Sequence, residues 1–427
     1  MTLKNFLFLG GENRYMYSKH KSLIMVLIFL LCFINIGCQK KDKTGKEEKK
    51  ELSLYIDVKD KYSLSVIKFI VDEFKKENED IKVNVNTPLD SNKLKDDIIQ
   101  GNSGDIIFTS RNTMIELGRK GLLNDLNNLY SKNKVNDKFY NILSTYGRIG
   151  DKYFGIALVP FSLEIFYSNL NLQKLGMNPP QNINDIVSIL KRLNEEKIRV
   201  PVVLTEDLEI NNGLASIFFS NSMDMQKIEK SYDSGKKSYQ ELVEIQKIFN
   251  DEYYLVKQGV INKESFELGN ENSMNKLTNG DVPLLIGISY LAKDIKDTNI
   301  GIVDKYNISK NKENIPIIVN CIACTPTSIK NEESANTFAT FILSEKVQKA
   351  LAKEGFVTGS KKANEDSTGI NKIIVKHISE ANLNSILYVY NFPKIFQSQF
   401  EAKLARVLGG KYNDNEWKEI TDDVYNK

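Results

Sequence analysis

The chain between residues 52 and 109 shows three short extended patterns of apolar and polar positions. Leu52–Asp57 and Ile81–Val85 alternate apolar with polar side chains, and residues 105–109 (DIIFT) hold a short apolar run. Alternation with a period of two predicts half-buried strands, and the apolar run after a glycine-rich turn predicts a buried one. We therefore expect three strands in this part of the chain.

Helical patterns separate these three strands. Apolar side chains recur at helical spacing from Leu64 to Phe74, with Ser63 as the expected N-cap. A shorter helix is expected around residues 92–100, before the turn at residues 101–104. Strands alternating with helices predict a parallel sheet covered by helices, in which ligands bind beyond the carboxyl ends of the strands. The loops after Ile56 and Phe108 are therefore candidate site loops.

The remaining pattern continues as mixed strands and helices. We expect further strands at Tyr153–Leu158, Ile165–Tyr167, Val200–Leu204, Val282–Ile286 and Ile315–Cys324. We expect helices after an N-cap at Asn184, across most of residues 213–257, and as a pair from Ala335 to Leu351 that ends at Gly355. The fold class predicted from these patterns is α/β.

Length and composition agree with an ordinary globular protein. The chain has 427 residues, of which 41% are hydrophobic and 26% are charged, and this length suits two lobes of normal domain size. No run after residue 40 is long and apolar enough to span a bilayer. The body from Glu51 is slightly acidic, which gives no reason to expect a nucleic-acid partner.

The first fifty residues carry the pattern of an export signal. Basic residues at 19–21 precede the apolar run Leu23–Phe33, and the segment ends on Gly37-Cys38. This ending resembles a bacterial lipobox, in which Cys38 is lipidated and becomes the first residue of the mature protein. We expect residues 1–37 to be the signal peptide, with Met16 as a candidate true start. Residues 38–50 then form a lipidated cysteine and a charged tether.

Four segments of the body resemble the extracellular solute-binding proteins of ABC importers, in the branch that includes the maltose-binding proteins. They are LSLYIDVKD (52–60) with KLKDDIIQGNSGDIIFT (93–109) and ELGRKGLLNDL (116–126); GDKYFGIALVPFSLEIFYSN (150–169) with LGMNPPQNINDI (175–186); NGDVPLLIGISY (279–290); and residues 326–355 with the closing helix at 407–424.

This resemblance implies a two-lobed periplasmic-binding-protein-like fold, with lobes joined by crossing hinge segments that close on a ligand. Residues 51–159 plus about 305–366 are expected to form lobe 1. Residues from about 160 to 304, together with residues 367–427, are expected to form lobe 2. The resemblance also implies a lipid-anchored monomer on the outer face of the cell membrane that delivers a small solute, with sugar favoured, to permease subunits, without a cofactor.

Carrying the family's site over gives ten candidate ligand-binding residues. They follow predicted strands, where they offer hydrogen-bonding groups, or lie at the lobe crossing: Lys59, Asp60, Thr109, Ser110, Arg111, Asn112, Phe161, Glu206, Asp207 and Tyr290. Tyr290 offers a flat aromatic face to a sugar or ring. Arg111 could form a planar fork to an anionic group. Each of these side chains has a structural alternative, as a solvated loop residue or a packing residue.

The chain also departs from the maltose-binding pattern. Maltodextrin binders line their cleft with several Trp residues, whereas this chain has only Trp417, expected to pack inside the closing helix. Thr109 and Gln397 stand where stacking aromatics are expected. Maltodextrin is therefore disfavoured, and a short oligosaccharide, a monosaccharide or a non-sugar solute stays open.

Other motifs give little reason to expect catalysis. Cys321 and Cys324 have redox-motif spacing but lie in a predicted strand, where residues three apart face opposite ways. The only two His residues are His20 and His377, and no GxSxG, HExxH, GxGxxG or P-loop pattern is present. An extracellular enzyme that acts on glycans needs only two carboxylates and remains an alternative, as does a solute sensor without a transport role.

Overall fold

The first sheet confirms the parallel pairing expected at the start of the body. In the computed structural model, which describes residues 50–88, 93–220, 223–270, 272–296, 299–306, 315–319 and 321–426, its strand order is β2-β1-β3-β13-β6. Its strands are β1 (Lys50–Ile56), β2 (Ile81–Asn86), β3 (Ile106–Thr109), β6 (Gly155–Ala157) and β13 (Ile322–Cys324). The strand β1 is parallel to both β2 and β3, and β13 is antiparallel to β3 and β6.

Helices cover this sheet, as the apolar stripes predict. They are α2 (Lys61–Glu77), α3 (Leu94–Ile99), α4 (Arg111–Arg119), α15 (Glu332–Ile342) and α16 (Glu345–Lys353). Phe74 of α2 packs edge-on against Phe338 of α15, with ring centroids 4.9 Å apart. The expected N-cap Ser63 is wrong: Asp60 caps α2 by accepting a hydrogen bond from the Ser63 amide at 2.7 Å. An aspartate three residues earlier offers a better placed oxygen to that amide.

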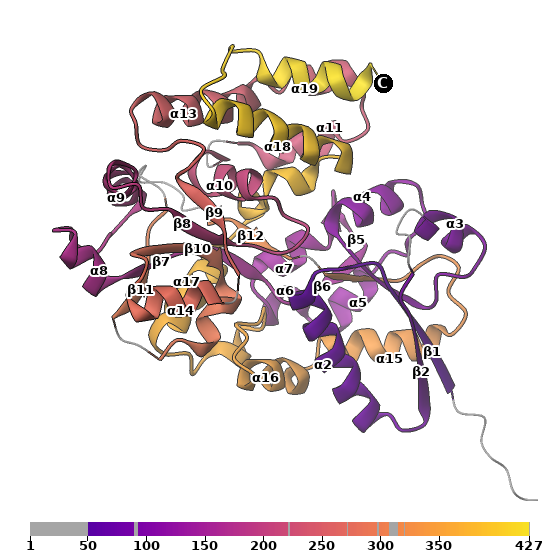
Figure 1. Ribbon diagram of the computed structural model, residues 1–427. Coiled ribbons are helices and arrows are strands. Elements are labelled where there is room, and N and C mark those ends of the chain that lie inside the picture. Colours follow the sequence, from indigo (N-terminus) through magenta and orange to yellow (C-terminus); the bar gives the residue numbers. More distant parts are fainter. Residues whose placement is uncertain are drawn as a thin grey trace, which may run out of the picture. The chain divides into compact units, whose positions relative to one another are not determined.

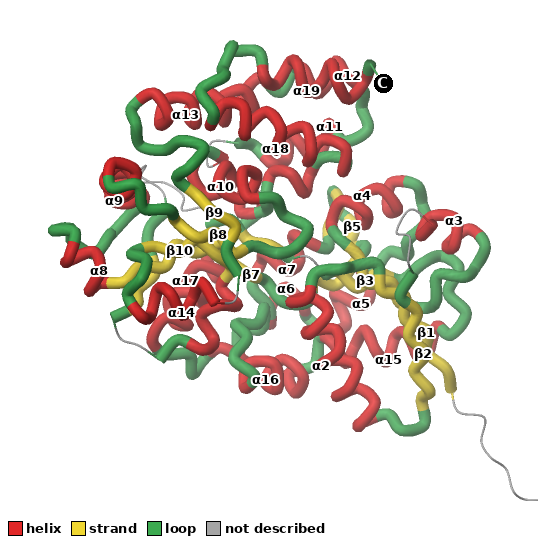
Figure 2. The backbone as a smooth tube through the Cα atoms, viewed as in Figure 1, coloured by secondary structure: helices red, strands yellow, loops and turns green. Residues whose placement is uncertain are grey.

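The second sheet has the strand order β11-β7-β10-β8-β9, and Figure 2 shows the strands gathered in two groups. Its strands are β7 (Phe161–Ser168), β8 (Val200–Val203), β9 (Phe266–Leu268), β10 (Leu284–Ile288) and β11 (Ile300–Ile302). The strands β8, β9 and β10 are parallel, whereas β7 is antiparallel to β10 and β11. A short strand, β12 (Ile317–Ile318), also pairs with β7.

Helices pack around the second sheet. They include α8 (Asn169–Lys174), α9 (Ile183–Glu195), α10 (Ile210–Phe218), α14 (Asn272–Asn279) and α17 (Gly369–Glu380). The helix α9 begins after Asn182 and not after the expected Asn184. Asn182 and Asp185 form a capping box, in which each side chain accepts a hydrogen bond from the other's backbone.

Shorter elements complete the described chain. The helices are α5 (Asn127–Lys132), α6 (Val135–Lys138), α7 (Asn141–Tyr146), α11 (Met225–Ser231), α12 (Lys236–Gln240) and α13 (Gln246–Lys257). A hairpin joins β4 (Arg148–Ile149) and β5 (Lys152–Tyr153). The 3-10 helices are η3 (Val243–Ile245), η4 (Ser289–Asp294), η5 (Lys362–Asn364), η6 (Leu383–Ser385) and η7 (Tyr388–Asn391).

Two connections between strands carry the chain from one sheet to the other. The chain leaves the first sheet after Ala157 of β6 and enters the second at Phe161 of β7; it returns between Ile318 of β12 and Ile322 of β13. The Leu158 amide donates to the Cys321 carbonyl at 3.1 Å, so the two crossings lie side by side. The stretch 315–324, expected as one strand, is therefore divided between two sheets.

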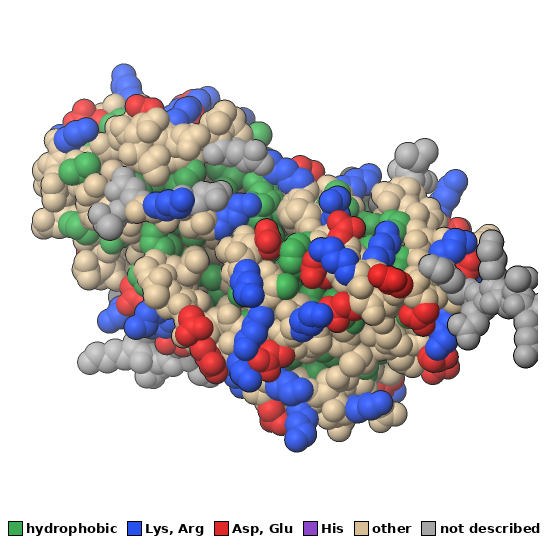
Figure 3. Space-filling model, turned by 90° about the horizontal axis from the view of Figure 1, so that it is seen from below, with side chains coloured by type: hydrophobic (Ala, Val, Ile, Leu, Met, Phe, Trp, Pro, Cys, Tyr) green, Lys and Arg blue, Asp and Glu red, His purple; other side chains and the backbone are tan. Residues whose placement is uncertain are grey.

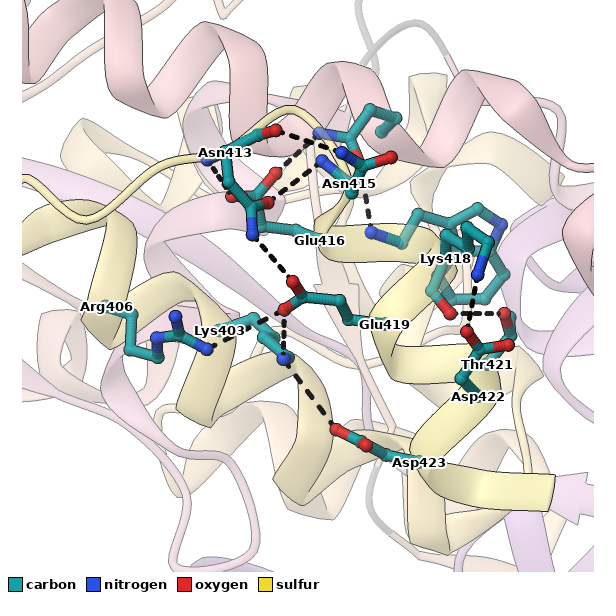
Figure 4. Close-up of polar contacts among 12 residues, drawn as sticks. Lys403, Arg406, Asn413, Asn415, Glu416, Lys418, Glu419, Thr421, Asp422 and Asp423 are labelled. Atoms are coloured by element: carbon teal, nitrogen blue, oxygen red, sulfur yellow. Dashed lines mark hydrogen bonds and ion pairs between the residues drawn. The ribbon is translucent and has the colours of Figure 1, made fainter. Parts of the chain in front are cut away.

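The closing helices α18 (Lys394–Leu408) and α19 (Glu416–Tyr425) lie next to each other (Figure 1) and are joined by a polar network (Figure 4). Lys403, which is only 8% exposed, donates to Glu419 at 2.5 Å and lies 3.7 Å from Asp423. On the apolar side, Trp417 packs between Phe392, Phe396 and Phe400, as expected of a structural tryptophan.

The strand β7 carries a buried ionisable network. Glu164 accepts hydrogen bonds from Ser162 and, at 3.3 Å, from Tyr306, and His377 Nδ1 lies 2.9 Å from its carboxylate. Burial opposes a charge on His377, but the charge and hydrogen bond of Glu164 outweigh it, so the pKa of His377 is raised above its usual value. This network ties α17 to β7 at the crossing between the sheets.

The molecule has two α/β sheets joined by paired crossings, and the predicted fold class is confirmed. Residues 50–427 pack as one unit. Cys321 and Cys324 are free and buried. Within the described ranges, none of the helices combines the length and the apolar character needed to cross a bilayer. On the face shown in Figure 3, cationic and anionic side chains are interspersed.

Candidate functional site

A polar cavity of about 200 Å³ lies where strands of both sheets end. Its described lining comes from the loop after β1, the start of α4, the loop after β8 and the start of α18: Asp57, Val58, Lys59, Asp60, Ser110, Asn112, Asp207, Lys394 and Gln397. Five of the ten residues predicted from sequence are brought together here: Lys59, Asp60, Ser110, Asn112 and Asp207. Both sheets contribute, as expected for a site at strand ends.

Asp60 links the two sides of the cavity. Its Oδ2 caps α2, and its Oδ1 accepts a hydrogen bond from the backbone amide of Glu206 at 3.4 Å. The residue is 2% exposed. Asp60 follows β1 and Glu206 follows β8, so this bond connects loops of different sheets. The side chain of Glu206 is exposed and does not line the cavity.

Asp207 carries a perturbed carboxyl group. Taken as a whole residue, Asp207 is exposed to solvent. Its carboxylate, however, is surrounded by protein atoms at the cavity and is desolvated. This desolvation, with the negative charge of Asp60, raises the pKa of Asp207 to about 6, against the opposing hydrogen bonds of Thr205 and Tyr390. The Tyr390 hydroxyl lies 3.4 Å from Oδ2 of Asp207. Two carboxylates from opposite sheets therefore face the same small space.

Hydrogen bonds fix the positions of several polar side chains that line the cavity. Asn112 is 2% exposed and donates through Nδ2 to the carbonyls of Val389 and Phe392, at 3.1 and 2.5 Å. Gln397 donates to Oδ1 of Asn112 at 3.3 Å. Thr109 is fully buried beside the cavity and donates to Asp57 at 2.9 Å. Thr109 thus orients a lining carboxylate without lining the cavity itself.

Arg111 is not brought to the cavity. It is 1% exposed, and it donates to Asn391 Oδ1 at 3.0 Å, to the carbonyls of residues 145, 146 and 148, and to Glu229 at 3.0 Å. Burial lowers the pKa of Arg111, and the charge of Glu229 opposes this effect. Arg111 therefore joins α4 to the end of α7, to η7 and to α11.

Phe161 and Tyr290 also lie outside the cavity lining. Tyr290 packs against Tyr62 at 4.8 Å, Phe356 at 5.5 Å and Phe161 at 6.1 Å between ring centroids. Lys293 donates to its hydroxyl at 2.6 Å and lies 4.2 Å from the ring centroid. No aromatic side chain of the described residues lines the cavity.

Sequence reasoning missed Asp57, Val58 and Lys394 as lining residues, and it considered Gln397 only as the replacement for an aromatic. Asp57 and Val58 precede the predicted pair Lys59 and Asp60, so their position in the same loop was a usable signal. Lys394 and Gln397 start a helix more than 180 residues after the last predicted lining residue. Only tertiary packing brings them to the strand ends. The predicted lipidation site Cys38 lies outside the described residues.

The two sheets, the paired crossings and the cavity at the strand ends define a two-lobed protein of the periplasmic-binding-protein-like class. Residues 61–349 match the model of the bacterial extracellular solute-binding protein family, and the chain belongs to this family. No curated protein matched the sequence.

Solved structures share this fold at low sequence identity. A family 1 extracellular solute-binding protein from Bifidobacterium longum subsp. infantis superposes with a TM-score of 0.66 at 16% identity, over 88% of this chain and 99% of that one. The sugar-binding protein MalE from Xanthomonas citri has a TM-score of 0.66 at 14% identity, over 88% and 96%. An ABC transporter solute-binding protein from Agrobacterium radiobacter K84, in complex with ribitol, has a TM-score of 0.63 at 14% identity, over 88% and 98%.

Proposed function

We propose that this protein captures a small polar solute outside the cell and delivers it to the permease of an ABC importer. The observation that carries the proposal is the cavity between strand ends of both sheets, lined by charged and amide side chains. A solute held there contacts both lobes at once, so its binding favours the closed arrangement.

The size and lining of the cavity favour a solute of one ring or a short polyol. A cavity of about 150 Å³ holds a benzene molecule, so about 200 Å³ suits one substituted six-membered ring. Carboxylates and amides bond hydroxyl groups in several directions. Without an aromatic platform among the described lining residues, stacked glucose units of a maltodextrin have little support. The ribitol bound by the Agrobacterium relative is of this small size class.

The proposal includes a membrane anchor and a division into lobes. Cys38 receives the lipid, the tether 39–50 spaces the body from the membrane, and the protein works as a monomer. Residues 51–159 with about 305–366 form lobe 1, and the rest of the body forms lobe 2. Growth of cells in labelled palmitate tests the anchor: the wild-type protein acquires label, and Cys38→Ala does not and appears in the medium.

A thermal-shift screen tests solute capture. The chain from residue 39 onward, which keeps every described residue, is heated with sugars, polyols, amino acids and polyamines. A solute that binds only the folded protein at a hundredfold excess over its Kd adds about 2.7 kcal/mol to the free energy of unfolding. The solute is recovered afterwards and must be chemically unchanged, because conversion would favour the enzyme alternative.

A matched pair of variants places the binding event in the cavity. Gln397→Trp puts an indole ring into the cavity and is expected to abolish the thermal shift, whereas Gln399→Trp, on the same helix outside the lining, is expected to keep it. Equal loss in both variants, or retained binding in Gln397→Trp, would place the solute elsewhere.

A further inference from the structure

The cavity lining has an excess of negative charge. Among the described lining residues, three carboxylates, from Asp57, Asp60 and Asp207, stand against two ammonium groups, from Lys59 and Lys394. Both lysines are exposed, and Asp60 is 2% exposed and Asp57 partly buried. Asp207 is exposed as a residue, but its carboxylate is desolvated. The buried part of the lining is thus acidic, and the cations lie at its exposed positions.

Asp60 is a buried carboxyl group, and its hydrogen-bond donors among the described residues are uncharged. Its two hydrogen bonds come from the backbone amides of Ser63 and Glu206. It has no ion-pair partner among the described residues. Burying a carboxylate without a countercharge is unfavourable, and backbone amides compensate only in part.

The second carboxylate makes this arrangement less favourable still. Asp207 follows Glu206 directly, so the bond from the Glu206 amide to Asp60 brings Asp207 next to Asp60. The two negative charges repel each other; after burial, which is the larger cause, the charge of Asp60 further raises the pKa of Asp207. Because these residues come from loops of different sheets, their repulsion opposes the approach of the two lobes when the cavity holds no solute.

We propose that the solute carries a protonated amine, as in an amino sugar or amino polyol, and that this amine sits between Asp60 and Asp207. This inference rests on the proposed function and names the chemical class of its solute. One ammonium group balances the excess charge of the lining and relieves the repulsion across the cavity. The Ser110 hydroxyl and the side-chain oxygen of Gln397 remain for hydroxyl groups of the same molecule, because the Asn112 amide and the Gln397 nitrogen already bond protein groups.

Alternative ligand charges fit the lining less well. A neutral sugar leaves the Asp60–Asp207 repulsion in place, and an anionic solute increases it. A ligand recognised by cation–π contacts needs an aromatic face, and none lines the cavity among the described residues. A charge-assisted hydrogen bond from an ammonium to each carboxylate is stronger than a bond from a neutral hydroxyl.

Matched ligand pairs test the inference by isothermal titration calorimetry at pH 7. The probes are glucosamine, galactosamine, mannosamine and 1-amino-1-deoxysorbitol, each against the parent sugar or polyol and against its N-acetylated form. We expect at least one amine to bind tenfold or more tightly than both of its neutral counterparts. We also expect this preference to shrink as the salt concentration rises.

Two variants connect the preference to the carboxylates. Asp60→Asn keeps an N-cap for α2, because asparagine caps helices as well as aspartate, and Asp207→Asn removes the facing charge. Each is expected to reduce the preference for the amine to less than threefold. Asp224→Asn, which replaces the N-cap aspartate of α11 outside the cavity, is the matched control and is expected to leave the preference unchanged.

The outcomes separate the inference from the proposed function. Equal or tighter binding of the neutral counterparts overturns the inference while confirming a solute-binding cavity. A preference that survives in both Asp60→Asn and Asp207→Asn also overturns it. If no amine in the panel binds, the inference falls, and the wider thermal-shift screen decides separately whether the protein captures any solute.

Discussion

The charge of a single residue, Asp207, makes the stability of the solute-free protein depend on pH. The pKa of Asp207 is about 6 in the folded protein and 3.8 in the reference state, so the folded state takes up a proton first as the pH falls. The contribution of this group to stability therefore rises from pH 7 to pH 4 and is least favourable above pH 6.

We expect Asp207→Asn to stabilise the solute-free protein at pH 7.5, where the wild-type carboxylate is charged. The advantage should diminish at pH 5, where the wild-type group is mostly protonated. Urea unfolding at both pH values measures the difference. Asp151→Asn, at an exposed turn after β4, serves as the control and should show no such pH dependence. An advantage of Asp207→Asn that is the same at both pH values would contradict the electrostatic explanation.

At the same scale, sequence alone located half of the ten candidate residues in one cavity. Lys59, Asp60, Ser110 and Asn112 follow β1 and β3, neighbouring parallel strands whose ends meet at one edge. Asp207 follows β8 of the other sheet, and only the family resemblance indicated it. Side-chain direction was not accessible in the same way. Arg111 lies between two lining residues, yet its guanidinium turns inward to carbonyls and to Glu229, which is 118 residues away. Tyr290 likewise finds ring partners that no local pattern indicates.

At the scale of elements, Arg111 joins four segments that are far apart in the sequence. Its removal leaves the buried part of the Glu229 carboxylate and several carbonyls of α7 and β4 without a donor. Breaking a buried ion pair from one side costs about 3–5 kcal/mol. We therefore expect Arg111→Met to lower the free energy of unfolding by this amount in a urea titration.

A surface ion pair provides the comparison for Arg111. Arg192 of α9 pairs with Glu196 at 2.7 Å, and both side chains are more than 40% exposed. Arg192→Met should change the free energy of unfolding by less than about 1 kcal/mol, as is usual for exposed pairs. If the two variants are equally stable, Arg111 is not the structural link that its hydrogen bonds indicate.

Most elements could be predicted from sequence, whereas their exact starts and partners could not. The spacing of apolar and polar positions correctly predicts several elements: the strands β1, β2, β3, β8 and β10 and the helix pair α15–α16. Asp60 and Asn182, not Ser63 and Asn184, cap their helices, because neighbouring polar residues compete for the same backbone amides. The stretch 315–324 was expected as one strand, but its two ends pair in different sheets. The pattern of apolar residues does not indicate where along a run the partner strand changes.

At the scale of the whole molecule, the single tryptophan packs on a helix that also lines the cavity, so its fluorescence can report on both. Trp417 is 3% exposed and its indole donates to the Tyr239 carbonyl at 2.9 Å. It packs on Phe396 and Phe400 of α18, and the first turn of the same helix provides Lys394 and Gln397 to the cavity. Tryptophan fluorescence therefore reports the closing helices, which share an element with the candidate site.

We expect unfolding followed by tryptophan fluorescence to coincide with unfolding followed by far-ultraviolet circular dichroism, since residues 50–427 pack as one unit. A solute that binds the cavity should move both transitions by the same amount, because it stabilises the lobes and the first turn of α18 together. Trp417→Phe removes the fluorescence signal and checks its source. If the fluorescence transition comes first and does not respond to the solute, the closing helices unfold independently, and α18 does not couple the cavity to the rest of the molecule.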